Sequence, residues 1–344
     1  MRFSRRGALR LGARLAGGAL AATALGGSAA PANGLMPLSP QVDRLPFFDA
    51  DDRSRTRFGE LSFRSGLEIN DPYPRFGGFS GLWRPRDGAR LIAVSDRGDW
   101  FAADVTEDAN GVSGFAAAMM APIRDFHGTP LGRTENYDVE AITIKDDIAH
   151  IGIERTNAIM RFDLTEDRPT ARGEFLPTPR EMRDWPHNAG PEAIAIAPDA
   201  SPFPGAIIVI GERTNRGESA PTQGYILDGE TYHAFDVARH DGFDITDMEF
   251  LDNGDILVLE RRYRILRDVG ARIRRLPGGD LRPGAVLDGP AIFEAGAGQQ
   301  IDNMEGLAAH RTRDGRRVLS LISDDNFSIL QRTLLLEFYY DDAD

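Results

Sequence analysis

A short phrase recurs along the chain at nearly even spacing, and it constrains the fold more than any other feature. Its clearest copy is Asp138-Val139-Glu140-Ala141-Ile142. The centres of the five copies are Ser80, Glu140, Glu192, Glu249 and Glu305. The steps between them are 60 (80 to 140), 52 (140 to 192), 57 (192 to 249) and 56 (249 to 305) residues. Because propeller blades and solenoid turns repeat every ~40–50 residues, we expect five copies of one supersecondary unit.

A second, apolar phrase follows each copy and ends in an acid. The terminal acids are Asp96, Glu154, Glu212, Glu260 and Asp324. Turn residues separate the two phrases in every repeat, as in Asp252-Asn253-Gly254. Short β-branched runs bounded by turns are typical of buried strands, so each repeat is predicted to open with a β-hairpin.

Each complete repeat has room for two more strands. Those expected are 158–162, 171–176, 223–227, 232–237, 271–274 and 291–293. Four antiparallel strands per repeat predict an all-β fold, a β-propeller of four-stranded blades. The last repeat has only three strands, so the spare run 60–64 is predicted to pair in the last blade and close the ring. We favour five blades, and a sixth is possible if a long loop hides one.

The N-terminal residues have the layout of a twin-arginine export signal. Arg5-Arg6 precedes a weakly apolar stretch that ends at Leu25, and small-x-small cleavage sites lie at 28–32. The alternative, a membrane anchor, needs an apolar helix of ~20 residues, and this stretch is shorter. The predicted organisation is therefore an export signal at 1–32, a linker at 33–56 and a propeller domain at 57–341. We expect a periplasmic or secreted protein with no membrane attachment after cleavage.

Composition narrows the possible partners. The chain has no cysteine, which excludes disulfides and thiolate metal sites. Loss of the signal removes five arginines and no acids, so the net charge changes from −13 to −18. Such a surface disfavours nucleic acid and anionic membranes and favours cations, or anions bridged through cations. We expect a monomer that binds a small anionic molecule.

Propeller geometry predicts where the acids lie. The first strand of a blade starts, and the second strand ends, on the same face of the channel. The four opening glutamates and the five closing acids should therefore gather at one mouth. Asp138, Asp247 and Asn303 lie two residues before an opening glutamate and could join them. Crowded carboxylates require bound metal, neighbouring arginines or protonation.

Oxygen ligands without cysteine suit Ca²⁺, which binds about 6–8 oxygens. The predicted metal ligands are Glu140, Glu192, Glu249, Glu305 and Asp324. An arginine follows the closing acid in four repeats, as Arg97, Arg155, Arg213 and Arg261. One interpretation is a structural ladder of ion pairs. The other assigns catalysis to Glu192 and Glu249, with Arg155 and Arg213 binding the substrate anion. His187 is the only histidine expected near this mouth.

The C-terminal repeat carries a family resemblance. Asn303-Met304-Glu305-Gly306-Leu307, the segment 321–328 and the segment 331–338 resemble the phytase-like family described as "esterase-like activity of phytase". Phe79-Ser80-Gly81-Leu82 and 93–98 are similar to its first repeat. The resemblance covers roughly residues 57–340. It implies a propeller rich in Asp and Glu, often exported and hydrolytic, without specifying a substrate.

These observations lead to three functional hypotheses. The first is an exported Ca²⁺-dependent phosphoesterase or esterase that acts on a small anionic ester at the acidic mouth. The second is a lactonase-type propeller in which one central Ca²⁺ polarises a carbonyl. The third is a non-catalytic envelope propeller that binds a ligand or a protein. The fold alone does not choose among them.

Overall fold

The computed structural model describes residues 34–165, 168–213, 216–217, 219–264 and 268–341. The predicted export signal lies outside these residues. Within them the structure is all-β, and its only helices are short 3₁₀ turns. These are η1 (Leu131–Arg133), η2 (Arg168–Thr170), η3 (Arg180–Asp184) and η4 (Gly278–Asp280). No helix in the described part of the chain is long and apolar enough to cross a membrane.

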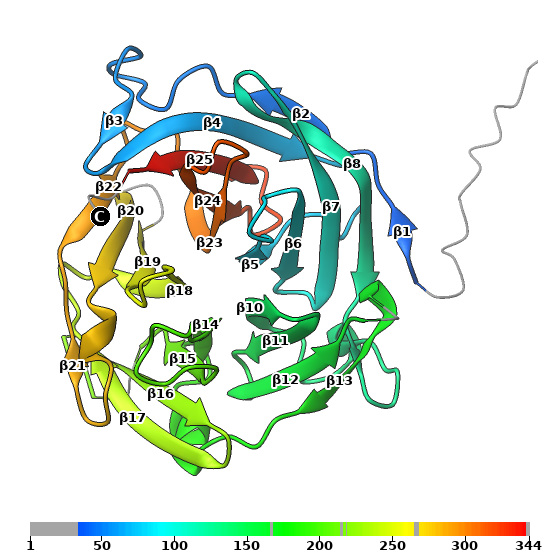
Figure 1. Ribbon diagram of the computed structural model, residues 1–344. Coiled ribbons are helices and arrows are strands. Elements are labelled where there is room, and N and C mark those ends of the chain that lie inside the picture. The colour runs from blue at the N-terminus through cyan, green and yellow to red at the C-terminus, as the bar shows by residue number, and fades with distance from the viewer. Residues whose placement is uncertain (1–33, 166–167, 214–215, 218, 265–267, 342–344) are drawn as a thin grey trace, which may run out of the picture. The chain divides into compact units, whose positions relative to one another are not determined.

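Five antiparallel sheets form the five blades of a propeller (Figure 1). Blade 1 contains β5 (Phe79–Trp83), β6 (Arg90–Ser95), β7 (Asp99–Asp108) and β8 (Gly111–Pro122). Blade 2 contains β10 (Val139–Lys145), β11 (Ile148–Ile153), β12 (Ala158–Asp163) and β13 (Arg172–Phe175). Blade 3 contains β14 (Pro191–Ile196), β15 (Ile207–Gly211), β16 (Thr222–Asp228) and β17 (Thr231–Val237). Blade 4 contains β18 (Asp244–Phe250), β19 (Ile256–Arg264), β20 (Asp268–Leu276) and β22 (Ala291–Ala295). Two short strands, β9 (Arg124–Asp125) and β21 (Val286–Leu287), add parallel edges to blades 2 and 3.

Blade 5 combines the two ends of the described chain. It contains β23 (Asn303–Arg311), β24 (Arg317–Asp324), β25 (Leu334–Tyr340) and β4 (Leu61–Asn70). The predicted N-terminal strand is thus present as β4, which pairs antiparallel with β25. The predicted linker also holds strands: β1 (Met36–Pro37) pairs with β8, and β2 (Gln41–Arg44) pairs with β4. A further strand, β3 (Arg57–Phe58), folds back on β4.

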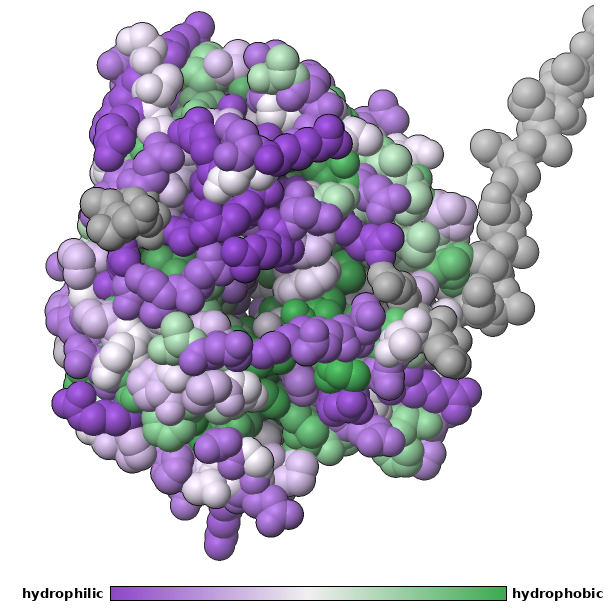
Figure 2. All heavy atoms as spheres, in the orientation of Figure 1, coloured by the Kyte–Doolittle hydropathy of each residue, from purple (hydrophilic) through white to green (hydrophobic). Residues whose placement is uncertain are grey.

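The first strand of each blade is innermost. These strands contact one another in the closed order β5, β10, β14, β18, β23 and β5 again. They therefore form the wall of a central channel. Figure 2, in the same orientation as Figure 1, shows hydrophilic side chains around a central hollow.

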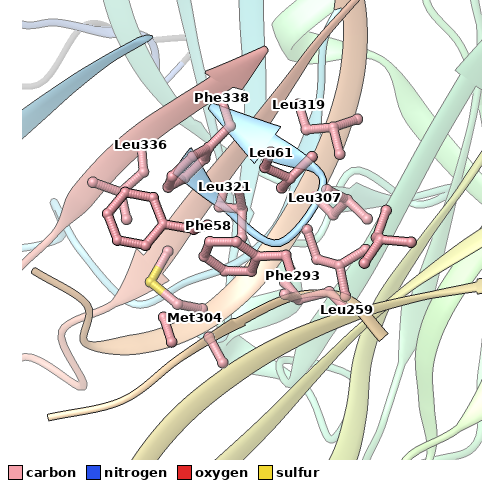
Figure 3. Close-up of a cluster of buried hydrophobic side chains, with 14 of the residues drawn as sticks. Phe58, Leu61, Leu259, Phe293, Met304, Leu307, Leu319, Leu321, Leu336 and Phe338 are labelled. Carbon is pink, nitrogen blue, oxygen red and sulfur yellow. The ribbon is translucent and has the colours of Figure 1, made fainter. Parts of the chain in front are cut away.

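Apolar side chains fill the interfaces between blades. Five buried clusters correspond to the five contacts between neighbouring blades. The largest, between blades 4 and 5, is shown in Figure 3, where Phe293 and Leu259 meet Phe338 and Leu321. Because neighbouring blades cover both faces of each sheet, strands in the middle of a blade, such as β15, are apolar at almost every position. Each buried Leu or Phe contributes about 1.5–3 kcal/mol, so the clusters position the channel strands firmly.

Candidate metal centre at the channel mouth

Every inner strand carries a β-bulge near its start. The bulge leaves one residue of each strand without a cross-strand partner: Ser80, Glu140, Glu192, Thr246 and Glu305. Bulges redirect side chains and are common beside functional sites. Since the five strands form the channel wall, the bulges place three glutamates at the same level of the channel.

The ends of the second strands supply a second set of residues at this level. The backbone N–H groups of Asp96, Glu154 and Glu212 bond the carbonyls of Gly78, Asp138 and Gly190, each two residues before a bulge. In blades 4 and 5 the same position pairs Arg261 with Asp244 and Asp324 with Asn303. The equivalent residues are therefore Asp96, Glu154, Glu212, Arg261 and Asp324. We call the acids of the two sets, with Asp138, the acidic mouth.

Blade 4 differs from the predicted alignment. The bulge falls at Thr246, so the phrase centred on Glu249 is displaced by three residues from the true repeat. Glu249 lies roughly 10 Å farther along β18, at about 3.3 Å per residue. Its carboxylate accepts hydrogen bonds from the N–H groups of Phe250 and Ala309 at 3.0 and 3.3 Å. It lines a 280 Å³ cavity with Asp252 and Arg311 instead of joining the other acids.

Glu260 also lies away from the mouth, because it precedes the equivalent position by one residue. Its carboxylate enters the wall of blade 4, where Arg272 and Arg274 bind it at 2.7 and 2.6 Å. For this acid the ion-pair interpretation is correct. Its place at the mouth is taken by Arg261, which sequence reasoning did not separate from the other arginines. The pair Arg261-Arg262 after Glu260 was the available signal for a one-residue shift.

The acids of blades 2 and 3 form two groups with the spacing of metal ligands. Asp138, Glu140 and Glu154 bring one oxygen each within 4.8 Å of one another, and we call them the Asp138 triad. Glu154, Glu192 and Glu212 do the same and form the Glu192 triad. Two oxygens bound to one Ca²⁺ lie at most roughly 5 Å apart. Both triads therefore fit a calcium ion, and Glu154 belongs to both.

Burial and mutual repulsion make these carboxylates difficult to ionise. Glu192 and Glu212 are each 4% exposed. Burial first, and then the charges of Glu140 and Glu212, raise the pKa of Glu192 well above its ordinary value. Burial and the charge of Glu154 likewise raise the pKa of Glu140. Burial raises the pKa of Glu305 to about 8 although Arg261 lowers it.

Arginine compensates only part of the mouth. Arg261 forms ion pairs with Glu212 at 3.3 Å and Glu305 at 3.1 Å. Arg213 lies at the rim, 2.6 Å from Asp244 and 3.5 Å from Glu212. The blade 4 side is therefore neutralised by guanidinium groups. Around Glu140 and Glu192, by contrast, no described residue forms an ion pair.

The other predicted site residues lie around the triads. Arg155 donates a hydrogen bond to the Tyr137 hydroxyl at 2.8 Å. Burial raises the pKa of Asp138, although the charge of Arg155 lowers it. Asp324 accepts a hydrogen bond from the Asn326 N–H at 2.6 Å, and burial raises its pKa to about 7. His187 lies beside this region, with Nδ1 3.4 Å from the carbonyl oxygen of Arg155. The structure thus brings Glu140 and Glu192 together with Glu154, and leaves Glu305 and Asp324 outside the triads.

A protein-family comparison places the geometry in context. A family model described as "Phytase-like: Esterase-like activity of phytase" matches residues 74–327. The chain belongs to this family. The matched range includes the inner strands of all five blades and every acid of the mouth in the phytase-like propeller.

Solved structures with similar folds are distant from this phytase-like chain. Glutaminyl cyclase from Myxococcus xanthus matches with 12% identity and a TM-score of 0.39, over 78% of this chain and 93% of that one. The PQQ-bound aldose sugar dehydrogenase from Streptomyces coelicolor matches with 12% identity and a TM-score of 0.41, over 88% and 99%. These weak likenesses carry no argument about function. No curated protein matches the chain.

Proposed function

We propose that this phytase-like propeller is an exported, calcium-dependent hydrolase that cleaves a small anionic ester, phosphoester or carboxylic ester, at its acidic mouth. The observation that carries the proposal is Glu192. This buried side chain lies among acids, shares a hydrogen bond with Glu154, and forms no ion pair with any described residue. An ionised carboxylate in that environment is strongly disfavoured unless a cation accompanies it. The all-oxygen surroundings favour a hard cation such as Ca²⁺.

The residues have separate roles in the proposed reaction. Carboxylates of the two triads would hold the cation, which would supply positive charge for the ester oxygens and make a nearby water more acidic. Glu192 has two carboxylate oxygens, so one is available to accept the proton of the attacking water. Arg155 and Arg213 at the rim bind the substrate anion through charge-assisted hydrogen bonds. The water oxygen bonds to the phosphorus or carbonyl carbon, the bond from that atom to the alcohol oxygen breaks, and the alcohol leaves with the proton that Glu192 accepted from water.

A single panel of assays tests the proposal. The purified protein is analysed for metal and assayed on phosphate esters, carboxylic esters and lactones, with calcium or with chelator. We expect turnover of one anionic ester class that chelator and Glu192→Gln abolish. Asp252→Asn, at the other end of the channel, is the control and should retain turnover. Lactone-only turnover would favour the lactonase alternative, metal binding without turnover would favour a binding propeller, and absence of both would refute the proposal.

Export is a separate part of the proposal. It rests on Arg5-Arg6 and on the small residues at 28–32. Replacing both arginines with lysine should retain the protein in the cytoplasm, because the twin-arginine pathway reads this pair. Cell fractionation measures the distribution. An unchanged periplasmic yield would contradict a twin-arginine signal.

A further inference from the structure

The cavity at the other end of the channel is lined by more positive than negative side chains. It has a volume of 280 Å³ and lies where the inner strands end. Along β10, Glu140 at the mouth and Lys145 at this cavity are separated by roughly 16 Å, at about 3.3 Å per residue. We infer that the cavity binds one small organic anion, with a carboxylate or phosphoryl group held by arginine and lysine and an apolar body against its walls. This site is separate from the acidic mouth, and the inference is independent of the proposed hydrolysis.

Two arginines of this cavity share a single carboxylate. Asp252, in the turn after β18, lies 3.1 Å from the guanidinium of Arg86 and 2.6 Å from that of Arg311. Arg317 is farther from it, at 3.9 Å. The hydrogen bond from Arg311 and the charges of Arg86 and Arg317 lower the pKa of this acid, although burial raises it. Among the described residues, Arg86 and Arg311 have no other acidic partner, so two positive charges share one negative charge.

Lys145 adds a cation that forms no ion pair with any described residue. It is the only lysine of the chain, it is exposed, and it lines the same cavity. The second acid of the lining is Glu249, and burial raises its pKa to about 7. This acid is therefore partly protonated at neutral pH. Two guanidinium groups and one ammonium group thus face Asp252 and a partly neutral Glu249, which leaves a net positive charge for an anion.

The walls of the cavity supply apolar contacts beside these charges. Ile144, Ile196 and Phe250 line it, and each remains partly accessible to solvent. Ligand sites commonly combine apolar walls with a few polar groups that fix the orientation of the ligand. Guanidinium groups bind carboxylate and phosphoryl oxygens through charge-assisted hydrogen bonds. An inorganic ion would contact the cations alone, whereas an organic anion would also remove the apolar side chains from water, which favours its binding.

An alternative role for these charges is to connect the blades. Arg86 follows the inner strand of blade 1, and Asp252 follows that of blade 4, which is not its neighbour in the ring. The side chains of Arg86 and Asp252 are, however, 74% and 49% exposed. Ion pairs this exposed contribute little to stability. Exposed guanidinium groups are, by contrast, accessible to a ligand from solvent.

Calorimetric titration of the whole protein with two probes, benzoate and phenylphosphonate, tests the inference. Chelator is present throughout, so that no cation at the acidic mouth attracts the probes. We expect one probe molecule per chain, bound more tightly than acetate or inorganic phosphate. The probe that binds more tightly identifies the preferred charged group. Benzyl alcohol, which is uncharged, should not bind.

Variants locate the binding. Arg311→Gln and Lys145→Gln should each weaken it about tenfold, since each removes a cation. Arg44→Gln is the matched control. The side chains of Arg44 and Asp108 are 33% and 49% exposed, the same fractions as in the Arg311 pair. Because Arg44 lies on β2, outside the cavity, its replacement should leave binding unchanged.

The outcomes decide the inference without any assay of hydrolysis, so failure of the proposed function would not affect them. Failure of both probes to bind would overturn the inference, and so would binding that Arg311→Gln and Lys145→Gln leave unchanged. Equal binding of acetate and benzoate would also contradict it, because the apolar walls would then have no part. Lys145→Gln remains a valid test if Arg311→Gln does not fold, since Lys145 is exposed and forms no ion pair with any described residue.

Discussion

Two sets of glutamates in this propeller differ in whether arginine side chains form ion pairs with them. In the blade walls, Glu260 lies between Arg272 and Arg274, and Glu337 lies between Arg64 and Arg84. At the mouth, no described residue gives Glu192 or Glu140 an ion pair. Burial alone therefore does not distinguish a functional acid from a structural one. Under the proposed function, the lack of an ion pair distinguishes the mouth glutamates from the wall glutamates.

One group of residues in the blade walls has the spacing of metal ligands but already contacts arginines. Glu107, His310 and Glu337 bring ligand atoms within 4.8 Å of one another, as the triads do. Arg64, however, contacts both Glu107 and Glu337, and Arg84 contacts Glu337. The positive charge is already present, so no cation is required. The same ligand spacing therefore occurs with contacting arginines in the wall, and without an ion pair to Glu140 or Glu192 at the mouth.

The largest expected effect comes from removing a wall acid. Glu337 lies on β25, Arg64 on β4, and Arg84 directly after β5, so this ion-pair cluster connects blade 5 with blade 1. Glu337→Gln would leave the buried Arg84 guanidinium without its acid and Arg64 with Glu107 alone. We expect a loss of about 3–5 kcal/mol in the free energy of unfolding, measured by urea denaturation.

Its control is Glu107→Gln, which removes the partly exposed partner of Arg64 and should cost less than about 1 kcal/mol. Equal losses for the two variants would contradict the assignment of Glu337 as a structural acid. The experiment also tests whether β4 closes the ring. If it does, Glu337→Gln should broaden or split the unfolding transition as blades 5 and 1 separate.

Removing a mouth acid should raise the free energy of unfolding in chelator, whereas removing a wall acid should lower it. In chelator, Glu192→Gln should be more stable than wild type, because it removes a buried carboxyl group that neighbouring acids make difficult to ionise. With calcium at a hundredfold excess over Kd, wild type should gain about 2.7 kcal/mol, and the variant should gain little. Melting temperatures of both proteins in calcium and in chelator give the answer. Identical wild-type curves would make the acidic mouth structural only.

The fold was largely predictable from the sequence because blade strands leave strong local patterns. The apolar run that became β15 and the turn after β18 are visible without structure, and they recur at one period. The spare segment 60–64 predicted β4 because the last repeat lacked a strand. These sequence patterns follow from the requirements of strand pairing and burial, and few other sequences would meet both requirements.

The site was predicted less well because its geometry depends on single-residue register. Asp247-Met248-Glu249 imitates Asn303-Met304-Glu305 in sequence, yet the bulge of β18 falls at Thr246. Side chains on a strand change face with every residue, so a small slip sends an acid elsewhere. Glu260 pairs with Arg272 on the neighbouring strand, so its side chain lies in the wall of blade 4 and not at the mouth. Apart from the consecutive arginines Arg261-Arg262 after Glu260, no pattern in the sequence distinguishes these acids from Glu154 and Glu212.

Replacing Arg261 would remove the positive charge from the blade 4 side of the mouth. Arg261→Gln removes the guanidinium between Glu212 and Glu305, which leaves Glu305 without an ion pair and Glu212 with Arg213 alone. In chelator we expect a loss of about 2 kcal/mol, below the value for a fully buried pair because a quarter of the side chain is exposed. Calcium should recover part of this loss, since a cation can replace the missing charge. A loss that calcium does not change would show that Arg261 has only a packing role.

The smallest effect is expected at Glu249. Its carboxylate accepts hydrogen bonds from backbone N–H groups instead of pairing with arginine. Burial raises its pKa from 4.5 to about 7, although the N–H groups of Ala309 and Phe250 lower it. The folded protein therefore holds a proton that the unfolded chain releases near pH 4.5. The corresponding stability is fully present below pH 4.5 and is lost as the pH rises through 7.

Glu249→Gln removes this titration. Relative to wild type, the variant should be more stable at pH 8 than at pH 5, by on the order of 1–2 kcal/mol, since each pKa unit corresponds to about 1.4 kcal/mol and partial exposure reduces the effect. Urea denaturation of both proteins in chelator at the two pH values measures the difference. The mouth acids titrate equally in both proteins, so their contributions to the difference cancel. A difference independent of pH would mean that water reaches Glu249 and that its carboxylate is as easily ionised as a surface one.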